Sequence, residues 1–192
     1  MANPDRPTGF SFAKNLFGTP SWGVLRKSRI TSGAAADIFV GSPLTVVDGE
    51  DGAELGASDG DILGVAVAFG RDVPGMHGGY PGPFNPADLT TRFFDASAYT
   101  NTEWYVWYVP ALDNLFEIQS ASDLDLEMGD TADFTAESGN TTTGRSTVEV
   151  TTSSNADLNV VEYVETVDND RTLANTRYLV MFRNPLLKWT DT

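Results

Sequence analysis

Runs of β-forming residues, some continuous and some alternating with polar residues, recur along the chain and predict an all-β protein. Eight segments rich in Val, Ile, Thr, Tyr, Phe and Trp are bounded by Gly, Pro, Asn and Asp, as strands usually are. No stretch of about 12 residues carries the 3.6-residue apolar period of an amphipathic helix. We therefore expect a single β-barrel or β-sandwich domain. The predicted strands are Gly23–Ile30, Ile38–Val47 (interrupted by Gly41 and Pro43), Ile62–Gly70, Glu103–Val109, Leu115–Gln119, Ser146–Thr152, Leu158–Val167 and Thr176–Arg183.

The patterns of individual segments also predict how each is buried. Glu103–Val109 (EWYVWYV) is nearly continuous in β-forming residues, which is typical of a strand buried on both faces. Ser146–Thr151 alternates polar and apolar residues, as a half-exposed strand does. Asp123–Glu127 alternates acidic residues with leucine like a strand with one acidic face. We expect that face to be solvated, with a weak cation site as the alternative.

Three segments have the composition of irregular structure. Residues 1–21 contain several Gly and Pro with scattered aromatics. This composition favours an extended N-terminal arm that orders by packing on another surface. The domain itself is then expected to span residues 22–192. Asp48–Asp61 is an acidic, Gly-rich loop or hairpin tip. Residues 73–88 form a Pro/Gly loop that holds His77, and a loop of this length in a small β domain is usually functional or flexible.

The overall composition excludes several classes of function. The 27 acidic and 12 basic residues give a formal net charge of −15, which argues against nucleic-acid binding. The absence of Cys excludes disulfides, thiol nucleophiles and Cys-type zinc sites, and a single histidine excludes multi-histidine metal sites. The chain has no run of about 18 apolar residues and no apolar signal segment, so we expect a soluble protein made in the cytoplasm with no membrane contact.

The charge is unevenly distributed along the chain. Residues 1–33 carry five cations and one acid, and residues 171–192 carry four cations and one acid. Residues 72–170 hold 18 of the 27 acids but only Arg92 and Arg145 as cations. A solvated acidic surface explains this pattern, and the alternative is that the basic ends dock on an acidic partner while the middle faces solvent.

No pattern in the sequence indicates catalysis. His77 lies beside two glycines and is better explained as a loop residue than as a general base. The acidic segment Asp48–Gly52 does not follow the spacing of an EF-hand loop, and phosphate-binding glycine motifs are absent. A pair of carboxylates for glycoside cleavage is conceivable among so many acids, but nothing selects one. We therefore expect no catalytic residues, no cofactor and no bound metal, and predict that the protein is not an enzyme.

Several segments resemble one known group of proteins. The opening MANPDRPTGF is similar to the pattern MAN-x-DRP-x-GF, and Ile38–Leu44 to IF-x-GDPV, with Ser42 in place of the usual Asp. Further similar segments follow in consistent order, whereas residues from about 72 to 101 match nothing in the pattern. The group consists of small decoration, or cement, proteins of tailed-bacteriophage heads. The further segments are Gly64–Val65, Leu115–Gln119 (containing FEIQ), Gly139–Ser146 (GN-x-x-TG-x-S) and Tyr178–Asn184 (a terminal strand).

This resemblance implies a structural virion protein. Members of the family sit on the outside of an icosahedral head, often as trimers, and clamp neighbouring major capsid subunits after the shell expands. The implied partners are the major capsid protein and further copies of the chain, and the implied location is the outer capsid surface after synthesis in the host cytoplasm. The function lies in surfaces, so no catalytic residues carry over.

The basic ends and the N-terminal aromatics suggest which residues make the contacts. We predict that four aromatic residues of the N-terminal segment act as apolar anchors at the trimer or capsid contact, with three cations as polar rim contacts. The alternative is that these aromatics close the core of the domain itself. The residues are Phe10, Phe12, Phe17 and Trp22 for the anchors, and Arg26, Lys27 and Arg29 for the rim.

A carbohydrate-binding host-attachment module of a head fibre or tail is the alternative function. Its shallow aromatic site would be formed by Tyr80, Phe84 and the Trp104–Tyr108 segment. Alternating aromatics in a strand more often fill a β interior, so core packing competes with this interpretation.

Overall fold

The computed structural model of the protein describes residues 2–18, 24–31, 34–46, 52–71, 91–98, 104–152 and 155–187. Within these ranges the chain forms thirteen strands in three sheets and one short 3₁₀ helix, η1 (Ala96–Ala98). The prediction of an all-β fold with packed sheets is therefore confirmed. Trp22 and the loop of residues 73–88 with its His77 lie outside the described residues.

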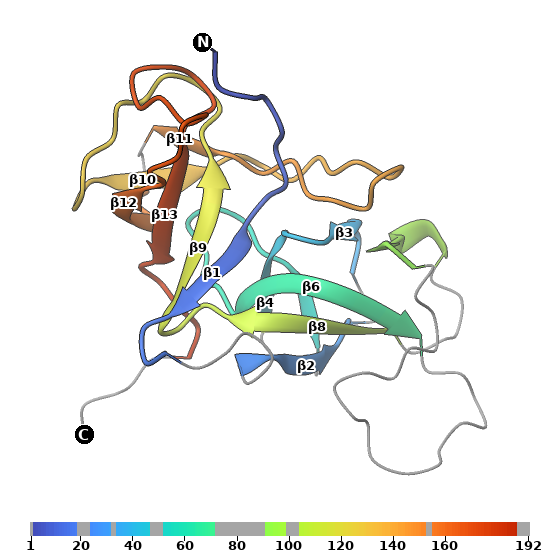
Figure 1. The fold of residues 1–192 in the computed structure, drawn as a ribbon. Helices are drawn as coiled ribbons and strands as arrows, with labels where there is room; N and C mark the ends of the chain where they lie inside the picture. Colours follow the sequence, from blue (N-terminus) through green and yellow to red (C-terminus); the bar gives the residue numbers. More distant parts are fainter. Residues whose placement is uncertain are drawn as a thin grey trace, which may run out of the picture.

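The larger sheet has six antiparallel strands (Figure 1), and its β11 edge curls back to the end of β9. Residue Ser120, directly after β9, forms a parallel bridge with Val150 of β11, and the amide of Ala121 donates to the carbonyl of Val150 at 2.9 Å. The sheet therefore curls from β9 round to β11, while β1 lies outside this curl on the free side of β9. The strand order is β1 (Ser11–Asn15), β9 (Asn114–Gln119), β13 (Arg177–Phe182), β12 (Leu158–Tyr163), β10 (Thr131–Phe134) and β11 (Val150–Thr152).

The second sheet has five antiparallel strands and also curls. Ile30, directly after β2, bridges Ala53 of β5, and the amide of Thr31 donates to the carbonyl of Ala53 at 3.0 Å. A two-stranded ribbon, β3 (Ile38–Phe39) with β7 (Phe93–Phe94), contributes side chains to the interior of this curl. The order is β2 (Arg26–Arg29), β8 (Trp104–Pro110), β6 (Gly64–Arg71), β4 (Pro43–Val46) and β5 (Ala53–Leu55).

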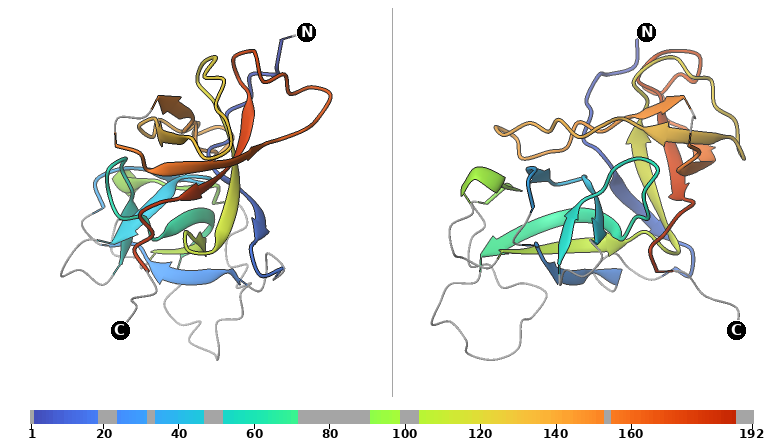
Figure 2. Two further views of the ribbon diagram at one scale, coloured as in Figure 1. Left: turned by 90° about the vertical axis from the view of Figure 1, so that its left-hand side faces the viewer. Right: turned by 180° about the vertical axis from the view of Figure 1, so that it is seen from behind.

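Two hydrophobic cores result, because the five-stranded sheet is buried on both faces. Successive side chains of a strand point to opposite faces. Val65 and Val109 accordingly join the core shared with the six-stranded sheet, whereas their neighbours Ala66 and Tyr108 join the core inside the five-stranded sheet. Figure 2 shows the two sheets as separate groups of strands, and the shared core contains side chains from both.

The strand β8 confirms the burial predicted from its sequence. Trp104, Val106, Trp107, Tyr108 and Val109 are all buried, and the strand lies between β2 and β6. Apolar side chains on both faces are required of a strand that separates two cores.

The N-terminal segment is part of the domain rather than an arm reaching elsewhere. The side chain of Asn3 is buried and donates to the carbonyls of Asp170 at 2.8 Å and Ala174 at 3.0 Å. Phe10 enters the shared core, and β1 pairs with β9. The surface on which this segment orders is thus the six-stranded sheet of the same chain, so the predicted division at residue 21 does not separate residues 2–15 from the domain.

The segment Asp123–Glu127 keeps the predicted alternation without forming a strand. Leu124 and Leu126 pack against the shared core, and the acidic residues between them are exposed. Arg171 binds two of these carboxylates, Asp125 at 2.8 Å and Glu127 at 2.9 Å. An internal arginine therefore compensates part of the acidic face.

Candidate functional site

The predicted anchor residues occupy three different environments. Phe10 is 2% exposed and packs against the rings of Phe116, Phe134 and Phe182 at centroid distances of 4.8 to 6.3 Å. Phe12 is half-buried against the same core. Phe17 is 78% exposed. The alternative that the aromatics close the core therefore holds for Phe10, whereas Phe17 is available to a partner.

Phe17 belongs to a turn that backbone hydrogen bonds hold in place. With Leu16, which is 52% exposed, it forms what we call the apolar tip. The amide of Leu16 donates to the carbonyl of Asp113 at 3.0 Å, and the amide of Gly18 donates to the carbonyl of Asn15 at 3.1 Å. Gly18 has a φ of 75°, a conformation that favours glycine.

The side chain of Asn15 fixes this turn to β9. Its amide nitrogen donates to the carbonyl of Asp113 at 3.1 Å and to Oδ1 of Asn114 at 2.9 Å. Its Oδ1 accepts the amide of Phe17 at 2.8 Å, which is the side-chain turn that Asn commonly makes. An exposed aromatic ring on an ordered turn is costly to leave in water and loses little backbone entropy when it binds.

The predicted cationic residues lie together on β2, an edge strand of the five-stranded sheet. Arg26, Lys27 and Arg29 are exposed. The ammonium of Lys27 lies 3.8 Å from the ring centroid of Tyr105 and 5.4 Å from that of Trp107, which directs it along the sheet. We call these three residues the basic strand.

The aromatic residues considered for sugar binding are mostly inside the protein. Trp104, Trp107 and Tyr108 are buried, and burial raises the pKa of the Tyr108 phenol, an effect partly offset by Arg26. These three side chains therefore fill the β interior and present no open platform. Tyr80 and Phe84 lie outside the described residues.

Two buried aspartates have structural partners. Both oxygens of Asp157 accept the amide of Asp59 at 3.0 Å, and Asp133 accepts the amides of Asn155 at 2.9 Å and Asp157 at 3.2 Å. Burial, together with the charges of Asp133 and Asp59, raises the pKa of Asp157 against the lowering effect of the Asp59 amide. Across the described ranges, no group of three or more His, Cys, Asp or Glu is placed to hold a metal ion.

Glu137 ties three segments together. Its Oε2 accepts the hydroxyls of Ser42 and, at 2.7 Å, Ser146, and its Oε1 accepts the amide of Thr147 at 3.3 Å. The hydroxyl of Ser42 can donate to Glu137, which a carboxylate at this position could not do. Both serines are fully buried, so they stabilise the structure and are not exposed as nucleophiles.

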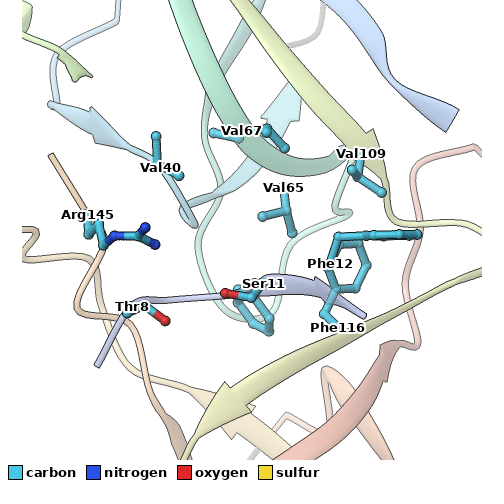
Figure 3. Close-up of a pocket in the computed structure, with 11 residues that line it drawn as sticks. Thr8, Ser11, Phe12, Val40, Val65, Val67, Val109, Phe116 and Arg145 are labelled. Carbon is cyan, nitrogen blue, oxygen red and sulfur yellow. The ribbon is translucent and has the colours of Figure 1, made fainter. Parts of the chain in front are cut away.

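A cleft that no sequence pattern indicated lies at the seam between the two sheets (Figure 3). It has a volume of about 170 Å³. Its floor consists of buried side chains from both sheets, including Phe10, Val65 and Phe116, and Val67 and Arg145 lie exposed at its rim. We call it the Arg145 cleft.

The fold and these surfaces define an all-β protein of packed sheets with an exposed apolar tip and an exposed basic strand. No family model, curated protein or solved structure matches the chain. In the part of the chain that the structure describes, no helix is long and apolar enough to span a membrane.

Proposed function

We propose that the protein is a decoration, or cement, protein of a tailed-bacteriophage head. It binds the outer surface of the capsid as a homotrimer and clamps neighbouring major capsid subunits, without catalysis, cofactor or nucleic-acid contact. The sequence resemblance along nearly the whole chain supports this proposal, and so does the all-β fold with its exposed contact surfaces. The structural observation that carries it is the apolar tip, where Phe17 is exposed on a turn fixed by Asn15.

The apolar tip and the basic strand are close enough to form one contact surface. Gly18 and Val24 are separated by six steps along the chain, so these ends lie at most about 22 Å apart. Figure 1 shows the end of β1 and the start of β2 at the same end of the molecule. An apolar centre with a polar rim is the usual composition of a protein interface of about 800 Å² per partner, and here the rim would be cationic.

The distribution of charge over the protein indicates which kind of partner surface the basic strand suits. The net charge is −15, and exposed acids gather in residues 121–130 and 162–170 of the six-stranded sheet's loops. The basic strand is therefore the part of the protein suited to an acidic capsid surface, while the acidic loops keep neighbouring particles apart.

The test measures binding to expanded empty heads by co-sedimentation, together with the mass of the free protein by light scattering. We expect the wild-type protein to pellet with heads. Phe17→Ser is expected to weaken binding about 10-fold or more, because burying a Phe side chain is worth about 1.5–3 kcal/mol. The double variant Arg26→Glu/Lys27→Glu is expected to weaken head binding as well, and the loss is expected to be larger at low salt than at high salt.

Two matched variants control for the loss of an exposed apolar residue and of a surface cation. Val167→Ser changes a fully exposed apolar residue on another loop, and Arg183→Glu reverses an exposed charge outside β2. Both are expected to bind heads like the wild type. Wild-type protein that stays in the supernatant at every head concentration would refute the proposal.

The carbohydrate-binding alternative has less support. Its site needs exposed aromatic faces, and three of the residues considered for it, Trp104, Trp107 and Tyr108, are buried in the cores.

A further inference from the structure

The Arg145 cleft is separate from the apolar tip and the basic strand. It is framed by β1 on one side and by β6 and β8 on the other, so it lies at the junction of the two sheets. Figure 3 shows the Arg145 side chain directed toward the cleft from one side, with Phe12 and Val109 at the other. An apolar cleft with a guanidinium at its mouth suits an apolar side chain that has a carboxylate next to it.

The loop that carries Arg145 is fixed by its own hydrogen bonds. Oδ1 of Asn140 accepts the amides of Thr142 at 2.9 Å and Thr143 at 3.0 Å, and the amide of Gly144 donates to the carbonyl of Asn140 at 2.7 Å. Val40 holds the loop to the rest of the domain, because its amide donates to the carbonyl of Gly144 at 3.0 Å. The guanidinium is therefore presented from an ordered base.

A second arginine adds to the positive charge at this rim. Arg92 packs directly on Gly144, where an added Cβ would lie 2.3 Å from the Arg92 Cβ, and its Nη1 donates to the carbonyl of Thr142 at 2.9 Å. A depression of about 220 Å³ lies between Arg92 and Arg145 and shares Val40 with the cleft. Among the residues that the structure describes, neither guanidinium is paired with a carboxylate.

The complementary surface is present on the same chain. Met128 is 78% exposed at the tip of a turn, and the neighbouring Asp125, Glu127 and Asp130 are exposed as well. The turn is ordered, since the amide of Asp130 donates to the carbonyl of Glu127 at 3.1 Å and the amide of Glu127 to Oδ2 of Asp130 at 2.8 Å. We call this feature the Met128 turn.

The Met128 turn lies on a different part of the molecule from the cleft. The amide of Gly129 donates to the carbonyl of Val160 on β12, at 2.9 Å. The cleft borders β1, and β9 and β13 lie between β1 and β12 in the sheet. A contact between the two features therefore joins two copies of the chain.

We propose that the Met128 turn of one copy docks in the Arg145 cleft of the next. The Met128 side chain enters the apolar cleft, where an unbranched thioether adapts to an irregular shape. Asp130 then faces Arg145 and Arg92, while Glu127, whose Oε1 is bound by Arg171 of its own chain, lies beside it. Two different surfaces meet in this contact, so it is head-to-tail, and repeated copies close into a ring where the rotation allows it. The proposal rests on the self-association in the proposed function, but not on capsid binding.

The experiment measures the mass of the full-length protein by light scattering over a range of concentrations. We expect the wild-type protein to form a closed oligomer. Met128→Ser and Arg145→Glu are each expected to raise its dissociation constant about 10- to 100-fold. Val167→Ser, which removes another exposed apolar residue with acids nearby, is the matched control and is expected to leave the mass unchanged.

A mixing experiment separates a head-to-tail contact from a symmetric one. Met128→Ser keeps an intact cleft and Arg145→Glu keeps an intact Met128 turn, so an equimolar mixture is expected to form a 1:1 dimer through its one remaining contact. The charge-swapped pair Asp130→Arg with Arg145→Asp in one chain is expected to restore part of the oligomer. Both positions are exposed, and thermal unfolding of each variant checks that the fold is retained.

Three results would overturn the inference. They are a wild-type chain that is monomeric at all concentrations, variants that keep the wild-type mass, and a mixture that stays monomeric. Failure of the capsid proposal is recognised separately, since it leaves the oligomer intact and abolishes pelleting with heads. An Arg145→Glu variant that remains oligomeric but no longer pellets would assign the cleft to the capsid and refute the self-docking.

Discussion

Two phenylalanines seven residues apart allow a direct test of which N-terminal aromatics belong to the core. Phe10 is 2% exposed and touches the rings of Phe116, Phe134 and Phe182, whereas Phe17 is 78% exposed on the apolar tip. Changing either residue to alanine removes the same atoms. The difference between the two variants therefore measures the environment alone.

The expected magnitudes differ by several kcal/mol. Replacing a buried Phe by Ala in a packed core costs about 3–5 kcal/mol, because the lost apolar burial is joined by a cavity. At about 2–4 °C per kcal/mol for a chain of this size, Phe10→Ala lowers the Tm by roughly 6–20 °C. Phe17→Ala changes the free energy of unfolding by no more than about 0.5 kcal/mol, because the ring is already in water.

The assay is thermal and urea unfolding followed by circular dichroism, at one protein concentration because self-association shifts the Tm. Co-sedimentation of the same samples with heads is the second measurement. Phe17→Ala is expected to bind heads weakly, whereas Phe10→Ala is expected to bind them normally below its Tm, where it is folded. A Phe10→Ala variant with the Tm of the wild type would show that the N-terminal segment does not contribute to the shared core.

Two further predictions concern buried groups. The pKa of Asp157 is raised from 3.8, so the stability that the protonated carboxyl contributes is fully present below pH 3.8 and is lost as the pH rises through the raised pKa. Asp157→Asn keeps an acceptor for the Asp59 amide and carries no charge. This variant is therefore expected to have a higher Tm than the wild type at pH 8, and the difference is expected to shrink toward pH 4. A difference that grows as the pH falls would contradict this reasoning. Gly41→Ala is expected to destabilise the protein by at least about 2 kcal/mol, because Gly41 has a φ of 95° and an added Cβ would lie 2.3 Å from the carbonyl oxygen of Thr8. Gly129→Ala is the control in urea unfolding, since its φ of 92° is similar but nothing lies within 4 Å of the added Cβ; equal losses in the two variants would refute the steric explanation.

The sequence was informative wherever structure depends on local pattern. The continuous β-forming run at Glu103–Val109 predicted β8 and its burial on both faces, and the alternation at Ser146–Thr151 predicted alternating burial there. Of that second segment, however, only Val150–Thr152 pairs as the strand β11. The alternation of polar and apolar residues determines which side chains are buried, but the hydrogen bonds of a β-ladder also require a partner strand.

Four strands were missed because their local patterns are weak. β1 (SFAKN) has only two apolar residues, which are adjacent and do not alternate, and it is extended because β9 supplies its hydrogen bonds. β5 lies in a segment that its acidic and Gly-rich composition assigned to a loop or hairpin tip, and it pairs with β4. β7 and β10 are likewise defined by their partners, β3 for one and both β11 and β12 for the other.

The candidate contact surfaces show the same division. Residue types alone determined that the N-terminal segment combines aromatic and cationic side chains and that the middle of the chain is acidic. Only the tertiary structure decided that Phe10 is core and Phe17 is surface, and that the Arg145 cleft opens at the seam of two sheets. Secondary structure and charge follow from neighbours in the chain, whereas burial and clefts depend on which distant segments pack together.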